Sequence, residues 1–190
     1  VVADACGKGI PACLLMAMTR SFIRANVQKF TTLSEMMKFL NDALYRDTGD
    51  ERYVTLACCL IDHKNDILEY ARGGHTELLV KVPGHKVRKI YPKGSATGLV
   101  PSDLIDEYET ISFLFRKEMT LLFFTDGITE ALNMEDQEFG IEKLTQAFEK
   151  TAEEQLNPYE TTERILKTVD EFTQGRAQSD DMTLLVIKRR

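Results

Sequence analysis

The sequence lacks long apolar runs and an excess of basic residues, and each absence excludes a class of protein. Uncharged stretches such as Met119–Phe124 fall far short of the roughly 20 apolar residues that span a bilayer. Lysine and arginine number 24 against 30 aspartates and glutamates, which argues against nonspecific binding to nucleic acid or an anionic membrane, since both need a basic face. The start of the chain also lacks the basic region of a signal peptide. We therefore expect a cytoplasmic domain that binds neither partner.

Cysteine and histidine are scarce, which argues against zinc sites, disulfide frameworks and catalysis by a side-chain nucleophile. The four cysteines, Cys6, Cys13, Cys58 and Cys59, have spacings typical of neither a zinc site nor a disulfide framework. We expect them to be reduced core residues, with the adjacent pair pointing to opposite faces of a strand. The three histidines form no convincing Cys–His or Ser–His pair in the sequence, which argues against a side-chain nucleophile.

The periodicity of apolar residues predicts an α+β chain in which hairpins dominate. Because βαβ units are scarce, a doubly wound parallel sheet is disfavoured. The pattern fits antiparallel sheets packed face to face with helix pairs outside. The expected helices are 10–30, a second from Thr32 or Ser34 through 44, 141–155 and 159–173; the expected strands are 1–4, 53–62, 67–74, 76–82, 85–91, 108–115, 119–126 and 180–190.

Three acids stand at predicted strand ends. Asp4 closes "VVAD", Asp126 closes "LLFFTD" and Asp180 opens "DDMTLLVI". A carboxylate beside a buried strand is costly unless a cation or a donor compensates it. Each acid alone is better explained as a turn or helix cap. The three together, without a histidine cluster, favour a hard cation with oxygen ligands, Mg²⁺ or Mn²⁺ rather than Zn²⁺.

Four motifs carry a resemblance to a known family across essentially the whole chain. They are "ADACGKGIPACLLMA", "ARGGHTELLV", "LLFFTDGITEA" and "SDDMTLLVIKR". In this order they closely resemble the metal-dependent protein phosphatases of the type 2C superfamily, in the bacterial branch of sporulation stage II E and RsbU-like stress-response phosphatases. The resemblance implies a four-layer α-β-β-α sandwich of two antiparallel sheets, with a centre of two Mn²⁺ or Mg²⁺ ions.

The resemblance also implies roles for single residues. Asp4 would bridge the two metals, the carbonyl of Ala5 would be a further ligand, and Asp126 and Asp180 would complete the set. A metal-activated water would attack phosphoserine or phosphothreonine. The implied substrate is a phosphorylated anti-anti-sigma factor of the STAS type in a bacterial partner-switching pathway.

Several neighbouring residues invite a functional interpretation beside a plainer one. Gly127, Asp181 and Lys8 could surround the metals or touch substrate. A solvated loop lysine is the plainer interpretation of Lys8, whose "GKG" lacks the P-loop spacing. His75, in "GGH", is better explained as a hydrogen-bonded turn residue, and Cys6 has no base beside it in the sequence.

The sequence also departs from the family pattern at its beginning. Relatives carry an upstream strand with a further metal-ligating aspartate, so we expect a single phosphatase-like domain over 1–190 that lacks its first strand or strands. The open sheet edge would invite a homodimer, and the missing ligand keeps a second hypothesis open, a non-catalytic binding or regulatory module. A third hypothesis, a receiver domain with Asp126 as phosphoacceptor, requires alternating βα units that the hairpins contradict.

Overall fold

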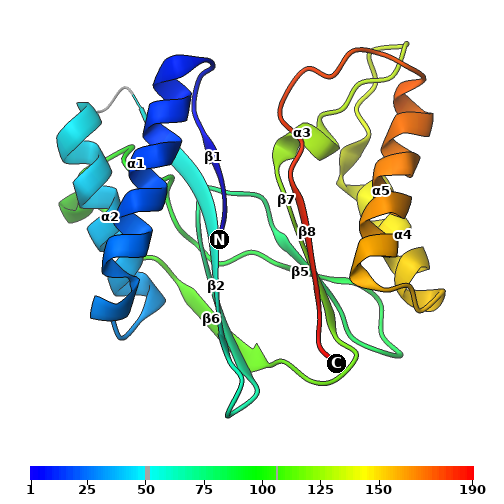
Figure 1. Cartoon of the computed structure of the whole chain (residues 1–190), viewed down its shortest axis with the longest axis horizontal. Helices are drawn as coiled ribbons and strands as arrows, with labels where there is room; N and C mark the ends of the chain where they lie inside the picture. The colour runs from blue at the N-terminus through cyan, green and yellow to red at the C-terminus, as the bar shows by residue number, and fades with distance from the viewer. Residues whose placement is uncertain (50–51, 106) are drawn as a thin grey trace. The chain divides into compact units, whose positions relative to one another are not determined.

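The chain forms two units, each built on one four-stranded antiparallel sheet that helices cover on one face (Figure 1). The computed structural model describes residues 1–49, 52–105 and 107–190. Unit 1 comprises residues 1–75 and 91–114, and unit 2 comprises residues 76–90 and 115–190. Each unit is therefore assembled from two separate segments of the chain.

Unit 1 carries the sheet with strand order β1-β2-β3-β6, in which every neighbouring pair is antiparallel. Pro11 suits the first turn of its first helix, and Thr32 caps the second by accepting a hydrogen bond from the Glu35 amide at 3.2 Å. Its elements are β1 (Val2–Ala5), α1 (Ile10–Asn26), η1 (Val27–Lys29), α2 (Leu33–Thr48), β2 (Val54–Asp62), β3 (Ile67–Gly73), η3 (Ser102–Leu104) and β6 (Thr110–Leu114).

Helix α2 packs against the apolar face of this sheet, and one buried asparagine sits within the contact. Met37 and Leu44 of α2 are fully buried in one cluster with Leu56 of β2. Asn41, equally buried, accepts from the Gly98 amide at 2.8 Å and donates to a carbonyl of the same loop. Its amide therefore ties the loop that follows β5 to the helix.

Unit 2 carries the sheet with strand order β5-β4-β7-β8, again antiparallel throughout. Asn157 begins its last helix with a capping box that includes Glu160. Its elements are β4 (Leu78–Lys81), β5 (Arg88–Ile90), β7 (Thr120–Phe124), α3 (Asp126–Thr129), α4 (Gly140–Glu153), α5 (Pro158–Thr173) and β8 (Leu184–Lys188).

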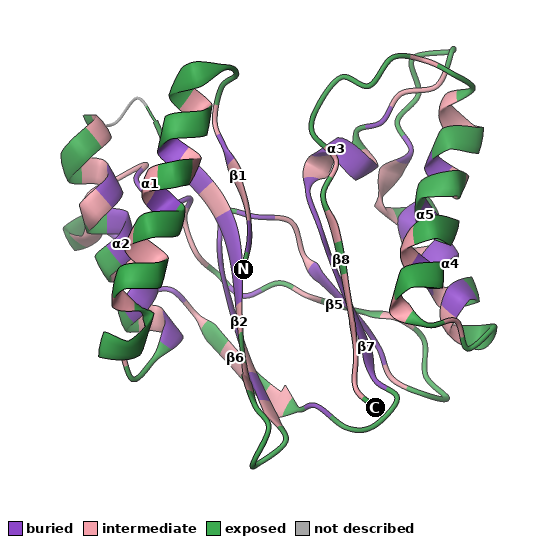
Figure 2. Cartoon of the chain, viewed as in Figure 1, coloured by how far each residue is buried: buried purple, intermediate pink, exposed green. Residues whose placement is uncertain are grey.

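Helices α4 and α5 bury one side against the sheet of unit 2 and expose the other, as Figure 2 shows by colour. Phe148 of α4 and Ile165 of α5 are fully buried in one cluster with Leu79 and Leu122 of the sheet. The hydrophobic effect on this apolar side holds the helix pair in place. Among the helices that the structure describes, none is long and apolar enough to cross a membrane.

Arg72 binds both the segment that leaves unit 1 and the segment that returns to it. Its guanidinium is buried, donates from Nε to the Pro92 carbonyl at 2.8 Å and also donates to the His75 carbonyl. It stacks over the Tyr91 ring, 3.4 Å from the ring centroid. One cation therefore satisfies carbonyls on either side of the excursion into unit 2.

The predicted α+β fold, with two antiparallel sheets and flanking helix pairs, is confirmed. A receiver domain is excluded, because both sheets are antiparallel. One part of the cysteine prediction is wrong: Cys13 is exposed, while Cys58 is buried. The reason is that Cys13 lies on the side of α1 that faces away from the buried cluster of the unit.

Candidate metal-binding acids

Asp126 lies directly after the buried strand β7, but it is not a strand residue. The strand ends at Phe124, and Asp126 begins the short helix α3, which corrects the predicted strand end. Thr125 intervenes and is buried. Its hydroxyl donates to the Asp181 carbonyl at 3.0 Å and accepts from the Thr183 amide at 2.9 Å. This side chain binds the end of β7 to the segment that carries Asp180.

Asp180 also lies outside the strand that the sequence predicts for it. Strand β8 begins only at Leu184, because the Thr183 amide donates to the Thr125 hydroxyl instead of to a backbone carbonyl, although the Thr183 carbonyl still accepts from the Thr125 amide at 3.1 Å. The Asp181 amide donates to the Asp180 carboxylate at 2.8 Å, and Gln178 donates to the Asp180 carbonyl at 2.6 Å. Both aspartates are exposed, so their outer oxygens face solvent.

Gly127 allows the backbone of residues 180–181 to lie directly against the start of α3. A Cβ at this position would be 2.5 Å from the Asp181 carbonyl oxygen and 3.3 Å from that of Asp180. No side chain other than hydrogen fits at that distance. Gly127 therefore brings the Asp180–Asp181 segment close to Asp126, although Asp126 and Asp180 are more than 50 residues apart in the sequence.

The electrostatics of unit 2 confirm that these acids share one region. The pKa of Glu130 is raised, first by partial burial and then by the negative charges of Asp126, Glu138 and Asp180. A bound cation would relieve the negative charge that surrounds Glu130. Carboxylate and carbonyl oxygens, with no imidazole or thiolate in this group, are the donors that Mg²⁺ and Mn²⁺ prefer. The acids of unit 2 therefore have the donor chemistry that a hard divalent cation prefers.

Sequence reasoning missed three residues that support this region: Thr125, Glu130 and Arg176. The guanidinium of Arg176 donates to the Asn133 carbonyl at 2.6 Å and pairs with Asp136 at 2.6 Å. It ties the loop before Asp180 to the loop after α3. A threonine immediately before the strand-end acid was a visible signal, whereas the partners of Arg176 are more than 35 residues away in the sequence.

The other predicted residues lie in unit 1. Asp4 is a half-buried residue of β1, opposite Thr55 of β2, and Ala5 is buried beside it. Lys8 is exposed in the loop that leads to α1. The predicted acids are thus divided between the units: Asp126, Asp180 and Asp181 belong to unit 2 and Asp4 to unit 1. Among the described residues, no group of three or more acid, histidine or cysteine side chains is arranged to hold a metal ion.

His75 and Cys6, also in unit 1, have structural partners. The His75 ring is buried, and its Nδ1 shares a hydrogen bond of 2.9 Å with the Thr55 hydroxyl. The Tyr53 amide donates to the sulfur of Cys6 at 3.1 Å. His75 is therefore a hydrogen-bonded residue of a turn, as the sequence favours.

Known proteins with solved structures share this fold. The SiaA-PP2C domain of Pseudomonas aeruginosa superposes with a TM-score of 0.83 at 19% identity, over 99% of this chain and 74% of that one. The PP2C phosphatase domain of SpoIIE from Bacillus subtilis, with a fragment of its regulatory domain, gives 0.79 at 22% identity, over 98% and 54%. The RsbU and RsbW domains of Rv1364c from Mycobacterium tuberculosis give 0.77 at 19% identity, over 99% and 50%.

Comparison of sequences gives the family. Protein IcfG of Synechocystis sp. is 22% identical over 216 residues, which cover 100% of this chain and 33% of that protein. The chain thus spans about a third of the length of this curated relative. The family model of stage II sporulation protein E matches residues 1–190. The chain therefore belongs to the stage II sporulation protein E (SpoIIE) family, and it has the fold of the PP2C phosphatase domains.

Proposed function

We propose that this chain is a metal-dependent serine/threonine phosphoprotein phosphatase domain. The observation that carries the proposal is the region of unit 2 in which Gly127 and Thr125 hold the Asp180–Asp181 segment against the start of α3, where Asp126 lies. Its donors are oxygens alone, as Mn²⁺ or Mg²⁺ requires. Membership of the SpoIIE family and the PP2C fold support the same assignment.

The proposal gives each acid a role in holding two divalent cations. Asp126, Asp180, Asp4 and the carbonyl of Ala5 would be the ligands, as the family resemblance implies. When bound, such cations lower the pKa of a coordinated water and neutralise charge on phosphoryl oxygens.

The remaining residues would position these acids or contact the substrate. Thr125 and Gly127 fix the separation between Asp126 and the segment that carries Asp180. The Asp181 amide orients the Asp180 carboxylate by donating to it. The exposed ammonium of Lys8 suits a phosphate group of the substrate, because lysine binds phosphate as a point charge.

We infer that the substrate is a phosphoserine or phosphothreonine on a protein, and that this protein is a STAS-type anti-anti-sigma factor. The solved relative that combines RsbU and RsbW domains supports a place in partner switching. A cytoplasmic location and a homodimer belong to the same proposal.

Hydrolysis of p-nitrophenyl phosphate and of a phosphoserine protein, with and without Mn²⁺, tests the proposal. We expect turnover that requires Mn²⁺ and that Asp126→Asn lowers by about 100-fold or more, since even residues behind metal ligands cost 10- to 100-fold. Asp170→Asn is the matched control, an exposed acid of α5 in the same unit. Equal activity of the Asp126→Asn and Asp170→Asn proteins would refute the proposal. Binding of the phosphoprotein without turnover would support the non-catalytic module instead.

A further inference from the structure

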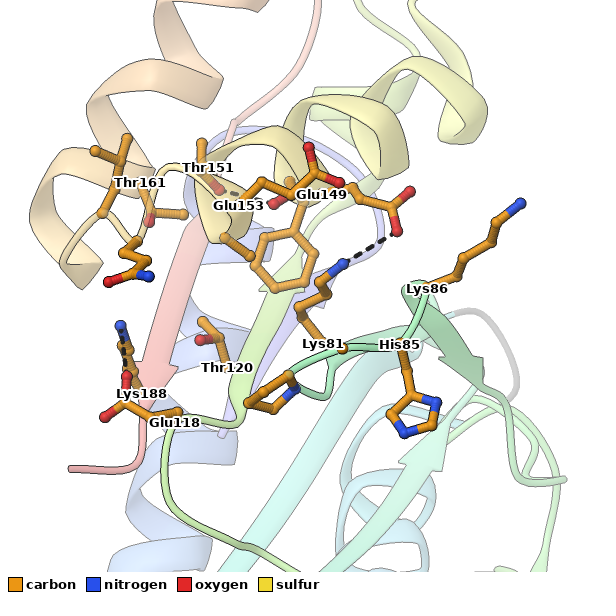
Figure 3. A pocket seen from close by; sticks show the side chains of 16 residues that line it. Lys81, His85, Lys86, Glu118, Thr120, Glu149, Thr151, Glu153, Thr161 and Lys188 are labelled. Atoms are coloured by element: carbon orange, nitrogen blue, oxygen red, sulfur yellow. Dashed lines mark hydrogen bonds and ion pairs between the residues drawn. The ribbon is translucent and has the colours of Figure 1, made fainter.

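Unit 2 contains a groove of about 790 Å³ that the proposed phosphatase site does not use (Figure 3). It lies where β7 begins and β8 ends, between the sheet and the helix pair α4–α5. Asp126, in contrast, follows the other end of β7. Thr120 is the first residue of β7 and Asp126 follows its last residue by two positions, and the strand itself spans about 13 Å. The volume of the groove is within the range of small-molecule binding sites.

The floor of the groove is a row of three polar side chains across neighbouring strands. Lys81 of β4 is paired with Thr120 of β7, and Thr120 is paired with Lys188 of β8. Residues paired in this way point to the same face of a sheet. The row next to them on that face is Leu79–Leu122–Val186, which helices α4 and α5 cover. The apolar face of the sheet therefore ends in lysine, threonine and lysine.

The two lysines are held to different degrees. Lys81 is only 9% exposed, and its ammonium pairs at 3.1 Å with Glu149, which also accepts from the Val87 amide at 3.3 Å. Lys188 pairs at 3.1 Å with Glu118, whose side chain is 61% exposed. An ion pair with so exposed a partner contributes little. Lys188 can therefore exchange Glu118 for another anion at small cost in free energy. The ammonium of Lys81 has three N–H donors, and its bond to Glu149 uses one of them.

Thr120 supplies a hydroxyl between them. The residue is 6% exposed and lines the groove, and no hydrogen bond joins its side chain to another residue in the described part of the chain. Because the residue lines the groove, its hydroxyl can donate a hydrogen bond to an oxygen of a bound ligand. In Figure 3 the His85 and Lys86 side chains point away from this row, so the row itself forms the polar centre.

We propose that this groove binds the phosphate group of a small phosphorylated molecule. Adjacent strands lie about 4.8 Å apart, so the Cα atoms of Lys81 and Lys188 stand about 10 Å apart, and both long side chains reach a tetrahedral anion above Thr120. The ammonium groups and the hydroxyl would donate to its oxygens. The rest of the molecule would lie against Ala152 and Leu156 on the helical wall.

A titration of the isotope-labelled chain with inorganic phosphate, followed by backbone amide NMR spectra, tests this site. A chelator keeps the acids near Asp126 free of metal, and sodium chloride at matched ionic strength is the control. We expect saturable shifts at the amides of Thr120 and Lys188 with phosphate and none with chloride. Absence of saturable shifts at these amides would overturn the proposal.

Three variants make the test specific. Thr120→Val keeps the strand-favouring shape and removes the hydroxyl, and Lys188→Met removes an ammonium whose present partner is exposed; each should weaken phosphate binding by about tenfold. Glu149→Gln removes a competing negative charge and keeps an acceptor oxygen, so it should tighten binding, by up to about fivefold. Binding that all three variants leave unchanged would overturn the proposal. Asp126→Asn should leave it unchanged, which separates this site from the phosphatase proposal.

Discussion

Replacement of Gly127 by alanine tests whether the close approach of two segments in unit 2 builds the metal site. A Cβ would lie 2.5 Å from the Asp181 carbonyl oxygen and 3.0 Å from its carbonyl carbon, and ordinary contact begins only at 3.4 Å. The obstructing atoms are backbone, so the Asp180–Asp181 segment must move by about 1 Å, the scale at which overpacking costs about 1–3 kcal/mol. A displacement of this size lowers catalytic rates by about 100-fold.

The assay combines urea unfolding, Mn²⁺ titration calorimetry and phosphatase rates. Gly140→Ala is the matched control in the same unit, because Gly140 has a φ of 77° and its nearest obstruction is the flexible end of Glu142 at 3.8 Å. It should lose stability through backbone strain, by about 1 kcal/mol, yet bind Mn²⁺ normally. Gly127→Ala should lose Mn²⁺ affinity as well as stability. Normal Mn²⁺ affinity in Gly127→Ala, or an equal loss in both variants, would refute the reasoning.

Three further predictions concern unit 1. Asn41→Ala removes the oxygen that accepts from the Gly98 amide and leaves that amide buried without a partner, so urea unfolding should show a loss of about 2–4 kcal/mol. Burial raises the pKa of Cys58 to about 12 and that of Cys59 to about 11, from 9.0. The thiols of the unfolded chain ionise at a lower pH than those of the folded protein. The free energy of unfolding should therefore be constant below pH 9 and fall above it by about 1.4 kcal/mol per pH unit for each thiol. Cys58→Ala should reduce this slope, and an unchanged slope would contradict the raised pKa of Cys58. Iodoacetamide should modify the exposed Cys13 in the folded protein well before the buried Cys58 or the half-buried Cys59.

Local patterns were sufficient to predict the helices and hairpins. The apolar spacing of residues 33–48 and 158–173 sets one buried side for each helix, and both hairpins of the middle segment form as expected. The ends of β7 and β8 were not predictable in the same way. There the Thr183 amide donates to the hydroxyl of Thr125 instead of to a backbone carbonyl, and hydropathy carries no information about such a side-chain bond.

Features that depend on strand register were beyond the sequence. Lys81, Thr120 and Lys188 are separated by 39 and 68 residues, and only the pairing of three strands places them in one row. The supporting role of Arg176 likewise depends on loops that meet in the folded unit. By contrast, the family motifs identified the candidate acids directly, because each motif is contiguous in the chain.

The Arg72 cluster has a consequence for the order in which the protein folds. The chain leaves unit 1 after His75 and returns at Tyr91, and Arg72 holds carbonyls on both sides of this excursion. During synthesis from the N-terminus, β3 must therefore wait for β6, its neighbour more than 35 residues later, before the sheet of unit 1 is complete. The sheet of unit 1 is complete only after β4 and β5, two of the four strands of the unit 2 sheet, have been synthesised. A fragment that ends at His75 would keep its helices but would expose an unpaired strand, so aggregation rather than a stable half-protein is its expected outcome.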